Sequence, residues 1–355
     1  MNKQPFFSIL IPTKNRSHLV STAIESVLNQ SFDDFEIIIA DNDDNSSATK
    51  NVVSNFNDIR IKYIRTGGLS MVENWEAARN NSSGKFITVL EDKQAYYKHS
   101  LESIHNLILA KNCKVVTWKC SNTTITKALY NFRIIHPEKF SKIESSIIIN
   151  TYIQAKSYIG SVRIWNFIPR SINSCISSDL IQNILKDSSE NTFYSYYSPD
   201  ITSGFKVLFN TKYIYNTTKR LVYLTSKLGN GRLMHSNKNA SQKYFSGNNI
   251  VSNEIALRNV PIKNPTIIDN TIYSDFLHVK KLFRPDDTSI IMKPSIYAYM
   301  LYNSISMRFK YRGIYKEKMS SVTNYVDNDL DKINKKEFYQ KTRIKRLLGK
   351  RLVRK

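Results

Sequence analysis

The chain has 355 residues, 41% of them hydrophobic and 12% aromatic, and its 52 Lys and Arg against 29 Asp and Glu give a net charge of +23. This composition excludes a wholly disordered chain, and the length predicts one large α/β domain with an appendage. The chain has three cysteines and no zinc-type motif, its start does not resemble a leader, and it has no apolar run near the ~20 residues of a membrane span. These features predict a soluble intracellular protein. The positive charge predicts an anionic partner.

Strand and helix signals alternate through the first part of the chain. The run Phe7–Pro12 is short and apolar, as in a buried parallel strand, and apolar residues at helical spacing follow between residues 19 and 28. A second apolar run, Phe35–Ala40, predicts the next strand, and a helix over 48–55 and a strand over 59–64 come after it. This alternation predicts a parallel sheet with connecting helices.

A helix and a fourth strand follow a break at Gly67 and Gly68. Ser70 and Glu73 have the spacing of a capping box, which predicts that a helix begins directly after Ser70. The run Lys85–Leu90 then predicts a fourth buried strand. Doubly wound sheets bind ligands beyond the carboxyl ends of their strands, so the residues at those ends are candidates for a site.

Polar and charged residues stand at three of these strand ends. They are Pro12–Arg16 after the first strand, Asp41–Asp43 after the second and Glu91–Lys93 after the fourth. Contact with water at a strand end explains any one of them. Three together at one edge of a sheet predict a binding site.

The rest of the chain gives weaker signals. They predict strands over 114–118, 205–210 and 213–215, a helix over 178–186, a Gly-, Asn- and Lys-rich loop over 229–249, and helical structure from Pro294. We therefore expect a main domain over 1–225, in two halves (1–120 and 121–225). A mobile loop and connection over 226–280 and a helical extension with a basic tail over 281–355 would follow.

The order of these motifs resembles that of the family 2 glycosyltransferases with a GT-A fold. The segments that carry the resemblance are Phe7–Arg16, Ile37–Asp43, Asn74–Ala78 and Gly84–Asp92, and more weakly Tyr197–Gly204 and His235–Asn237. The resemblance covers residues 6–110 well and does not reach 281–355. It implies an α/β fold with a Rossmann-like, doubly wound mixed sheet, followed here by a helical, basic extension.

The resemblance also implies that 1–120 is the nucleotide-binding half and 121–225 the acceptor half, with a nucleotide-sugar site at the strand ends. Four residues after the first strand would line the nucleotide pocket: Pro12, Thr13, Asn15 and Arg16. Asp41 would accept hydrogen bonds from the nucleobase, and Asp43 either assists it or only solvates the loop. Asn74 would lie near the base or the diphosphate, although an Asn on an amphipathic helix is as often a capping or surface residue.

The acidic motif Glu91-Asp92-Lys93 departs from the family pattern. The family has an Asp-rich run here, whose last carboxylate holds Mn²⁺ or Mg²⁺ against the diphosphate. Asp92 keeps one acidic position for such a metal, but Lys93 stands where a second acid is expected. Lys93 either replaces the metal as the positive charge on the diphosphate, or points away while Glu91 and Asp92 bind the cation. A third reading is a site that has lost catalysis.

Two residues further along the chain complete the predicted site. Asp200, which follows Pro199, lies where the family places its catalytic base; the alternative is an ordinary Asp at a helix N-cap. The second acid often found beside that base is missing. His235 would close over the phosphates or bind the metal, unless it is a loop histidine with no role.

These residues predict an inverting glycosyltransferase that moves a sugar from a nucleotide sugar to a hydroxyl of a glycan or lipid-linked acceptor in bacterial surface polysaccharide synthesis. Asp200 would be the base, and Lys93 and Asp92 would handle the leaving group. The alternatives are a nucleic-acid-binding protein, suggested by the charge and the 21 tyrosines, and a catalytically inert glycan-binding relative. Nucleic acid is the less expected partner, because the tyrosines are not grouped with Lys and Arg.

The end of the chain concentrates the basic charge. Between residues 335 and 355, ten Lys and Arg stand against Glu337 alone. Four apolar residues recur at helical spacing from about Phe338 onward, with basic residues around them: Ile344, Leu347, Leu348 and Leu352. This is typical of a helix that lies on an anionic membrane surface. The tail predicts a cytoplasmic protein attached peripherally to the inner face of the cell membrane; a solvated tail without a role is the alternative.

Overall fold

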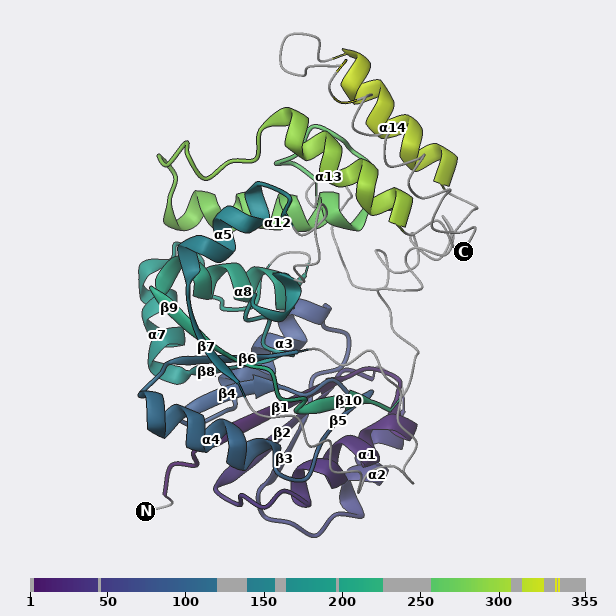
Figure 1. Ribbon diagram of the computed structural model, residues 1–355. Coiled ribbons are helices and arrows are strands. Elements are labelled where there is room, and N and C mark those ends of the chain that lie inside the picture. The colour runs from purple at the N-terminus through teal and green to yellow at the C-terminus, as the bar shows by residue number, and fades with distance from the viewer. Residues whose placement is uncertain are drawn as a thin grey trace, which may run out of the picture. The chain divides into compact units, whose positions relative to one another are not determined.

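The computed structural model describes residues 3–43, 46–119, 139–156, 164–195, 198–225, 257–307 and 315–328, together with Lys336 and Phe338. The chain divides into two compact units, whose elements are labelled in Figure 1. Unit 1 comprises Met1–Ile148, Arg163–Gly229 and Val279–Pro285, and unit 2 comprises Ile149–Val162, Asn230–His278 and Asp286–Lys355. All of the strand ends considered above lie in unit 1.

The first half of the chain alternates strand and helix, and the later part is mostly helical. The elements up to residue 118 are β1 (Phe7–Thr13), α1 (Ser17–Leu28), β2 (Phe35–Asp41), α2 (Ala48–Ser54), β3 (Ile61–Arg65), α3 (Met71–Asn80), β4 (Phe86–Val89), β5 (Gln94–Tyr96), α4 (Ser100–Lys111) and β6 (Val115–Trp118). Those that follow are β7 (Phe140–Glu144), α5 (Ser145–Ile153), the short 3₁₀ helix η2 (Ile164–Asn166), β8 (Ser174–Ser177), α7 (Ser178–Asp187), α8 (Pro199–Asn210), β9 (Tyr213–Thr217), β10 (Val222–Leu224), α12 (Ile268–Phe283), α13 (Pro294–Met307) and α14 (Tyr315–Asn328).

Unit 1 is built on a mixed eight-stranded sheet in the order β3-β2-β1-β4-β8-β6-β9-β7. β1 pairs in parallel with both β2 and β4, and β2 pairs in parallel with β3. β8 runs antiparallel to its neighbours β4 and β6, and β7 runs antiparallel to β9. The chain thus moves outward from β1 to β3 and returns to the other side of β1 with β4. The ends of β1 and β4 therefore form a topological switch point, where such sheets bind ligands.

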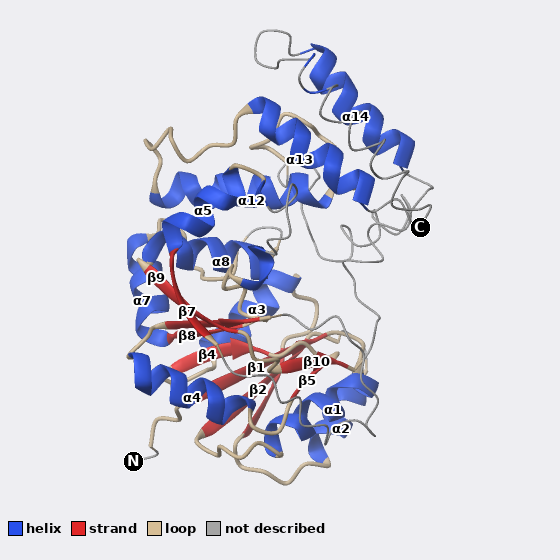
Figure 2. Cartoon of the chain, in the orientation of Figure 1, coloured by secondary structure: helices blue, strands red, loops and turns tan. Residues whose placement is uncertain are grey.

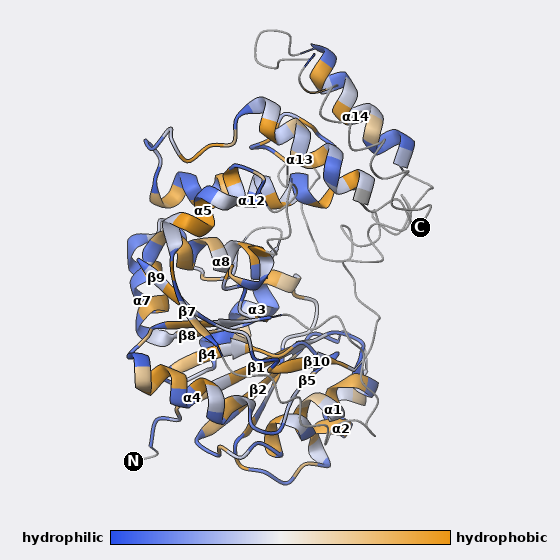
Figure 3. Ribbon diagram, viewed as in Figure 1, coloured by the Kyte–Doolittle hydropathy of each residue, from blue (hydrophilic) through white to orange (hydrophobic). Residues whose placement is uncertain are grey.

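Helices cover both faces of this sheet (Figure 2). On one face, Ile9 of β1 and Ile37 of β2 share a nonpolar core with Ile24 of α1 and with residues of α2 and α4. On the other face, α3 contacts β1 and β2. Figure 3 shows α3 as mainly hydrophilic, whereas β1 is mainly hydrophobic. The fold class predicted from the sequence, α/β with a doubly wound mixed sheet, is confirmed.

The first four predicted strands lie within two residues of their predicted bounds. The capping box is also confirmed, because Ser70 Oγ accepts from Glu73 N–H and the Glu73 carboxylate accepts from Ser70 N–H. The predicted strand over 205–210 is wrong. These residues belong to α8, which is buried on nearly every side, so its apolar residues show no helical period.

The segment 226–280, predicted as a loop and connection, is helical at its end. Residues 268–280 belong to α12, where Ile272, Phe276 and Val279 are buried at helical spacing. The predicted loop over 229–249 and the amphipathic tail helix after Phe338 lie outside the described residues.

Unit 2 contains an aromatic cluster between helices. Tyr273 and Phe276 of α12 stack with ring centroids 5.9 Å apart. Tyr297 of α13 lies 5.4 Å from Tyr273 and meets Tyr325 of α14 edge-on at 5.6 Å. The helical character predicted for the extension is therefore confirmed at α13 and α14. In the part of the chain that the structure describes, no helix combines the length and apolar content of a membrane span.

Candidate functional site

Asp92 joins the two loops at the switch point. The Thr13 hydroxyl, at the end of β1, donates to Asp92 Oδ2 at 3.0 Å, and Arg16 Nη1 donates to Asp92 Oδ1 at 3.2 Å. Asp92 is only 4% exposed. Burial raises the pKa of its carboxyl, and Arg16 and Thr13 act in the opposite direction. Three residues predicted for the site are thus in direct contact between the ends of β1 and β4.

Lys93 forms an ion pair within its own motif. Its Nζ lies 2.8 Å from Glu91 Oε1, and both side chains are mostly buried. The turn is fixed on both sides, because Glu91 N–H donates to Gln94 Oε1 and Thr225 N–H donates to Lys93 O. Lys93 therefore neutralises one of the two acids that a divalent cation would use.

The two acids at the end of β4 are already engaged within the protein, so a divalent cation would have to compete for them. Magnesium at phosphate sites is commonly bound by one or two carboxylates together with substrate phosphates and water. Among the described residues, no three His, Cys, Asp or Glu side chains are grouped in a way that could hold a metal ion. Asp92 already accepts from Thr13 and Arg16, and Glu91 is paired with Lys93.

A hydrogen-bond network fixes Asp41 at the end of β2. The Tyr63 hydroxyl donates to Asp41 Oδ2 at 2.8 Å, and Arg65 Nη1 lies 3.5 Å from the same oxygen. Asp43 N–H donates to Asp41 Oδ1 at 3.1 Å. Burial raises the pKa of the Tyr63 hydroxyl, and the hydrogen bond to Asp41 raises it further. Asp41 is fully buried, so a nucleobase would have to share Oδ1 or replace the long contact from Arg65.

Tyr63 and Arg65 were missed by the sequence analysis. Both belong to β3, and Arg65 is its last residue. The rule that drew attention to the ends of the first, second and fourth strands applies equally to the third. An arginine at that position was therefore a usable signal.

Two asparagines support the same edge of the sheet through hydrogen bonds to the backbone. Asn42 N–H donates to Thr13 O at 2.9 Å, and its side chain exchanges hydrogen bonds with the backbone of Leu69. Asn74 Nδ2 donates to Ala40 O at 3.2 Å, and its Oδ1 accepts from Thr66 Oγ1 at 2.6 Å. Both ends of the Asn74 amide are thus bonded to the protein, which places this residue as a support for the β2 end.

The other predicted nucleotide residues differ in exposure. Pro12 is half-buried, and Asn15 is exposed and has a positive φ of 56°. Asp43 is 6% exposed, and its Oδ1 accepts from Ser46 N–H at 3.1 Å. His235 lies outside the described residues.

Asp200 lies in the first turn of α8, after Pro199 at the start of the helix. Its Oδ2 is 3.6 Å from Arg170 Nη1, and 24% of its side chain is exposed. Burial has the largest influence on Asp200 and raises the pKa of its carboxyl; Arg170 lowers it, and Glu91 raises it. Glu91, in the motif at the end of β4, is thus one of the charged groups that act on Asp200.

Arg170 is a third residue that the sequence analysis missed. It lies in the loop before β8, and β8 is antiparallel to β4. The start of β8 is therefore at the same edge as the end of β4, and Val89 N–H donates to Ser171 O at 3.1 Å. Predicting the position of Arg170 would have required the direction of β8, and the short run Ser174–Ser177 does not indicate that direction.

Glu76 of α3 holds the segment that leads into α8. Its carboxylate accepts from the N–H groups of Phe193 and Tyr194 at 3.0 to 3.3 Å. Arg79 Nη2 lies 2.5 Å from Glu76 Oε1, and both side chains are about nine-tenths buried. A buried ion pair thus fixes the approach to Asp200. The sequence indicated only that Glu76 belongs to the motif Asn74–Ala78.

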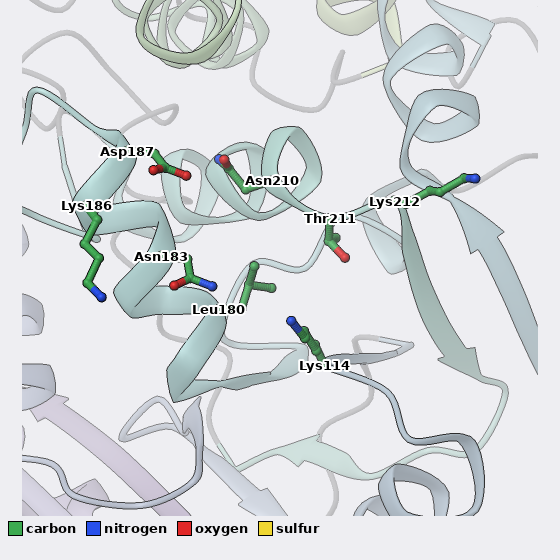
Figure 4. Close-up of a pocket in the computed structure, with 8 residues that line it drawn as sticks. All are labelled: Lys114, Leu180, Asn183, Lys186, Asp187, Asn210, Thr211 and Lys212. Atoms are coloured by element: carbon green, nitrogen blue, oxygen red, sulfur yellow. The ribbon is translucent and has the colours of Figure 1, made fainter.

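A cavity of about 430 Å³ lies at the opposite edge of unit 1. Its lining residues are Lys114, Leu180, Asn183, Lys186, Asp187, Asn210, Thr211 and Lys212. Lys114 precedes β6 and Lys212 precedes β9, so the cavity is at the amino-terminal ends of these parallel strands. Figure 4 shows the side chains of Lys186 and Lys212 pointing away from one another. This cavity is separate from the site at the carboxyl ends.

Comparison with known proteins agrees with this geometry. Residues 8–164 match the family model described as "Glycosyl transferase family 2". These residues belong to glycosyltransferase family 2. The resemblance predicted over residues 6–110 is thus confirmed, and the match extends to residue 164. It includes the ends of β1, β2, β3 and β4, so Thr13, Asp41, Arg65 and Asp92 all lie inside the family 2 region.

Two curated relatives match part of the chain. The GalNAc(5)-diNAcBac-PP-undecaprenol beta-1,3-glucosyltransferase of Campylobacter jejuni is 38% identical over 106 residues, covering 28% of this chain and 33% of that protein. The UDP-Glc:alpha-D-GlcNAc-diphosphoundecaprenol beta-1,3-glucosyltransferase WfgD of Escherichia coli is 32% identical over 109 residues, covering 30% of this chain and 42% of that protein. The chain therefore spans about two-fifths or less of the length of these relatives.

A solved structure covers more of the chain at lower similarity. S. aureus TarS 1-349 in complex with UDP-GlcNAc is 15% identical, with a TM-score of 0.49, over 90% of this chain and 89% of that one.

Proposed function

We propose that this protein transfers a sugar from a nucleotide-sugar donor to a hydroxyl group of an acceptor, with inversion at the sugar carbon. The observation that carries the proposal is the arrangement of charged groups at one edge of the sheet. Asp92 joins the loops after β1 and β4, and Asp200 in the first turn of α8 pairs with Arg170, whose loop is bonded to the end of β4. A donor bound at this edge would thus have cations on one side and a carboxylate on the other.

The ends of β1, β2 and β3 would bind the nucleoside. Asp41 would accept a hydrogen bond from the base, with Tyr63 and Arg65 holding its carboxylate. Thr13 and Arg16, which are bonded to Asp92, would line the pocket together with Pro12 and Asn15. Binding of this kind fixes the sugar carbon relative to the acceptor, which lowers the entropic part of the barrier.

Lys93 and Arg16 would carry the positive charge that the diphosphate leaving group requires. Bond breaking increases the negative charge on the diphosphate, and a fixed cation stabilises that charge more in the transition state than in the bound donor. Lys93 would exchange its Glu91 partner for a phosphate oxygen when the donor binds. We therefore propose that transfer does not depend on a divalent cation held by Asp92.

Asp200 would act as the general base. An ionised carboxylate removes the proton of the acceptor hydroxyl as its oxygen attacks the sugar carbon from the side opposite the leaving group, which inverts the configuration. Burial raises the pKa of the Asp200 carboxyl, and so makes it a stronger base than an exposed Asp.

The acceptor would be a glycan or a lipid-linked saccharide of the bacterial surface. The names of two relatives include undecaprenol-linked saccharides.

The basic tail would attach the enzyme to the anionic inner leaflet, where such an acceptor lies. With the residues after Asp331 removed, co-sedimentation with anionic vesicles at low salt should fall. Equal sedimentation of the full and shortened chains contradicts attachment through the tail.

A donor screen tests the proposed function. UDP, GDP, CMP and their sugars are added to the full chain, and thermal unfolding and sugar transfer or donor hydrolysis are measured. We expect one nucleotide series to raise the melting temperature, because a ligand that binds the folded state stabilises it, and its sugar to be turned over. Binding without turnover of any donor supports the inert relative. Salt-sensitive binding to DNA without nucleotide binding supports the nucleic-acid alternative.

A further inference from the structure

We infer that Arg170 is a positioning residue for Asp200: its guanidinium holds the Asp200 carboxylate towards the end of β4 and keeps it ready to accept a proton. This inference rests on the proposed function, in which Asp200 is the base. It adds a residue from outside the family 2 region, since the match ends at residue 164.

The loop that carries Arg170 is anchored on both sides. Ser171 O accepts from Val89 N–H at the end of β4, and Ser171 Oγ lies 3.3 Å from Ser203 Oγ of α8. Ser171 has a positive φ of 49°, a backbone conformation that an L-residue adopts only when its surroundings fix it. The loop thus ties β4 to α8, the two elements that place Glu91 and Asp200.

Gly204 allows this loop to lie close to α8. A Cβ atom at residue 204 would lie 2.7 Å from Ile168 Cγ2 and 3.3 Å from Pro169 O, which is too near for any other residue without a shift of the loop. Asp200 and Gly204 are one turn apart on α8. The absence of a side chain at Gly204 therefore brings Arg170 within reach of Asp200.

The distance between the two charged groups suits positioning. Arg170 Nη1 and Asp200 Oδ2 are 3.6 Å apart, within ion-pair range and beyond a hydrogen bond. Only 16% of the Arg170 side chain is exposed, so the pair is weakly screened. The attraction orients the carboxylate, while its oxygens keep the capacity to accept the hydrogen of an acceptor hydroxyl.

Two charged groups of opposite sign act on Asp200. Arg170, from the loop before β8, favours the ionised carboxylate, and Glu91, after β4, opposes it. The backbone N–H groups of Asp200 and Ile201, at the start of α8, also favour the ionised form. Removing either side chain should therefore change the proton affinity of Asp200, and the two changes should have opposite signs.

The experiment compares the pH dependence of kcat for the full-length wild type, Arg170→Gln and Glu91→Gln. Arg170→Gln removes the cation, so the acidic limb of the profile should move to higher pH and kcat should fall most at low pH. Glu91→Gln removes the anion and frees Lys93, so the limb should move to lower pH. Arg170→Lys keeps the charge, and its limb should lie nearer to that of the wild type.

Arg60→Gln is the matched control, because it also removes one arginine of unit 1. Arg60 pairs with Asp58 at 2.7 Å just before β3, at the edge away from the site, and its loss should leave the limb in place. If Arg170→Gln and Arg60→Gln give the same profile as the wild type, the inference is overturned. A common loss of kcat at every pH, without movement of the limb, also overturns it.

A titration without turnover separates this inference from the proposed function. With aspartate labelled with ¹³C at the carboxyl carbon, NMR follows the Asp200 signal, assigned by its loss in Asp200→Asn. Arg170→Gln should raise the pH at which this signal titrates. If no donor is turned over but the signal still moves, the proposed function fails and the pairing stands. If turnover is present and the signal does not move, the role of Arg170 fails alone.

Discussion

On the α1 face of the unit 1 sheet, four of the five buried residues of the helix are nonpolar and belong to the core: Val20, Ala23, Ile24 and Val27. On the α3 face, the buried residues of the helix include Asn74, Glu76 and Arg79, and each of them is hydrogen-bonded to protein groups. Nonpolar contacts have no direction and tolerate small shifts, whereas hydrogen bonds fix atoms at particular places. The α1 face therefore stabilises the sheet, and the α3 face positions the residues of the site.

The helices on the two faces also differ in which parts of the site their side chains contact. Asn74 bonds to the end of β2, next to Asp41, and Glu76 bonds to the segment that leads to Asp200. α1 begins directly after Arg16, but its buried face points into the nonpolar core. Substitutions on the α3 side should thus change function beyond their effect on stability, and those on the α1 side should not.

The largest effect is expected at Asp200, on the polar side of the molecule. Asp200→Asn keeps the size of the side chain and removes the proposed base, so kcat should fall on the order of 10²–10⁴-fold. Nucleotide binding, measured by thermal shift, should persist. Near-normal transfer by this variant would move the base elsewhere, with Glu190 or Asp187 as the next candidates.

Lys93→Ala should give the next largest loss. Removing a preorganised positive group from the diphosphate lowers kcat on the order of 10²–10³-fold, and wild-type transfer should persist in EDTA. The opposite pair of results, loss of activity in EDTA and little change in Lys93→Ala, would show that a divalent cation neutralises the diphosphate. Lys62→Ala is the control, since Lys62 bonds to the backbone of Asn81 at the surface.

Much of this arrangement follows from local patterns in the sequence. β1, β2 and β4 are buried parallel strands, whose short apolar runs are plain, and the residues after them fall at one edge by topology alone. Ser70 and Glu73 predicted the start of α3, because a capping box is a contact between residues close together in the chain. Thr13, Arg16 and Asp92 could therefore be grouped without a structure.

Other parts depend on contacts between distant segments. The run Phe205–Asn210 suggests a strand but is helical; because α8 is buried on nearly every side, its apolar residues show no helical period. Even Lys206 is covered, with its Nζ bonded to Thr192 O and Glu190. Arg170 could not be predicted as a site residue, because its position near the end of β4 depends on the direction of β8. For Asn74 the motif suggested a place near the ligand or a capping or surface role, and its partners, Ala40 and Thr66, could be found only from the fold.

A matched pair of core variants compares the two faces directly. Glu76→Gln breaks a buried ion pair and leaves Arg79 uncompensated, which should lower the free energy of unfolding by about 3–5 kcal/mol. Ile24→Ala, in the α1 core, should cost a similar amount, about 2–5 kcal/mol. At a temperature where both variants are folded by circular dichroism, Glu76→Gln should lose kcat and Ile24→Ala should keep it. Equal activity of the two variants would remove the distinction between the faces.

The smallest effect is expected at Asp41, because this residue would bind the part of the donor that does not react. Asp41→Asn removes a charge that accepts hydrogen bonds, and a hydrogen bond to a charged group is worth about 1.5–3 kcal/mol, which corresponds to roughly a 10- to 150-fold rise in donor KM. kcat at saturating donor should change little, since the interaction is the same before and during the reaction. Tyr63→Phe is the control: it removes the 2.8 Å hydrogen bond to Asp41 Oδ2 but leaves the carboxylate in place, so it should raise KM far less. Equal KM values for Asp41→Asn and the wild type would place the nucleobase away from the end of β2, and a fall in kcat without a change in KM would connect Asp41 to the reacting groups instead.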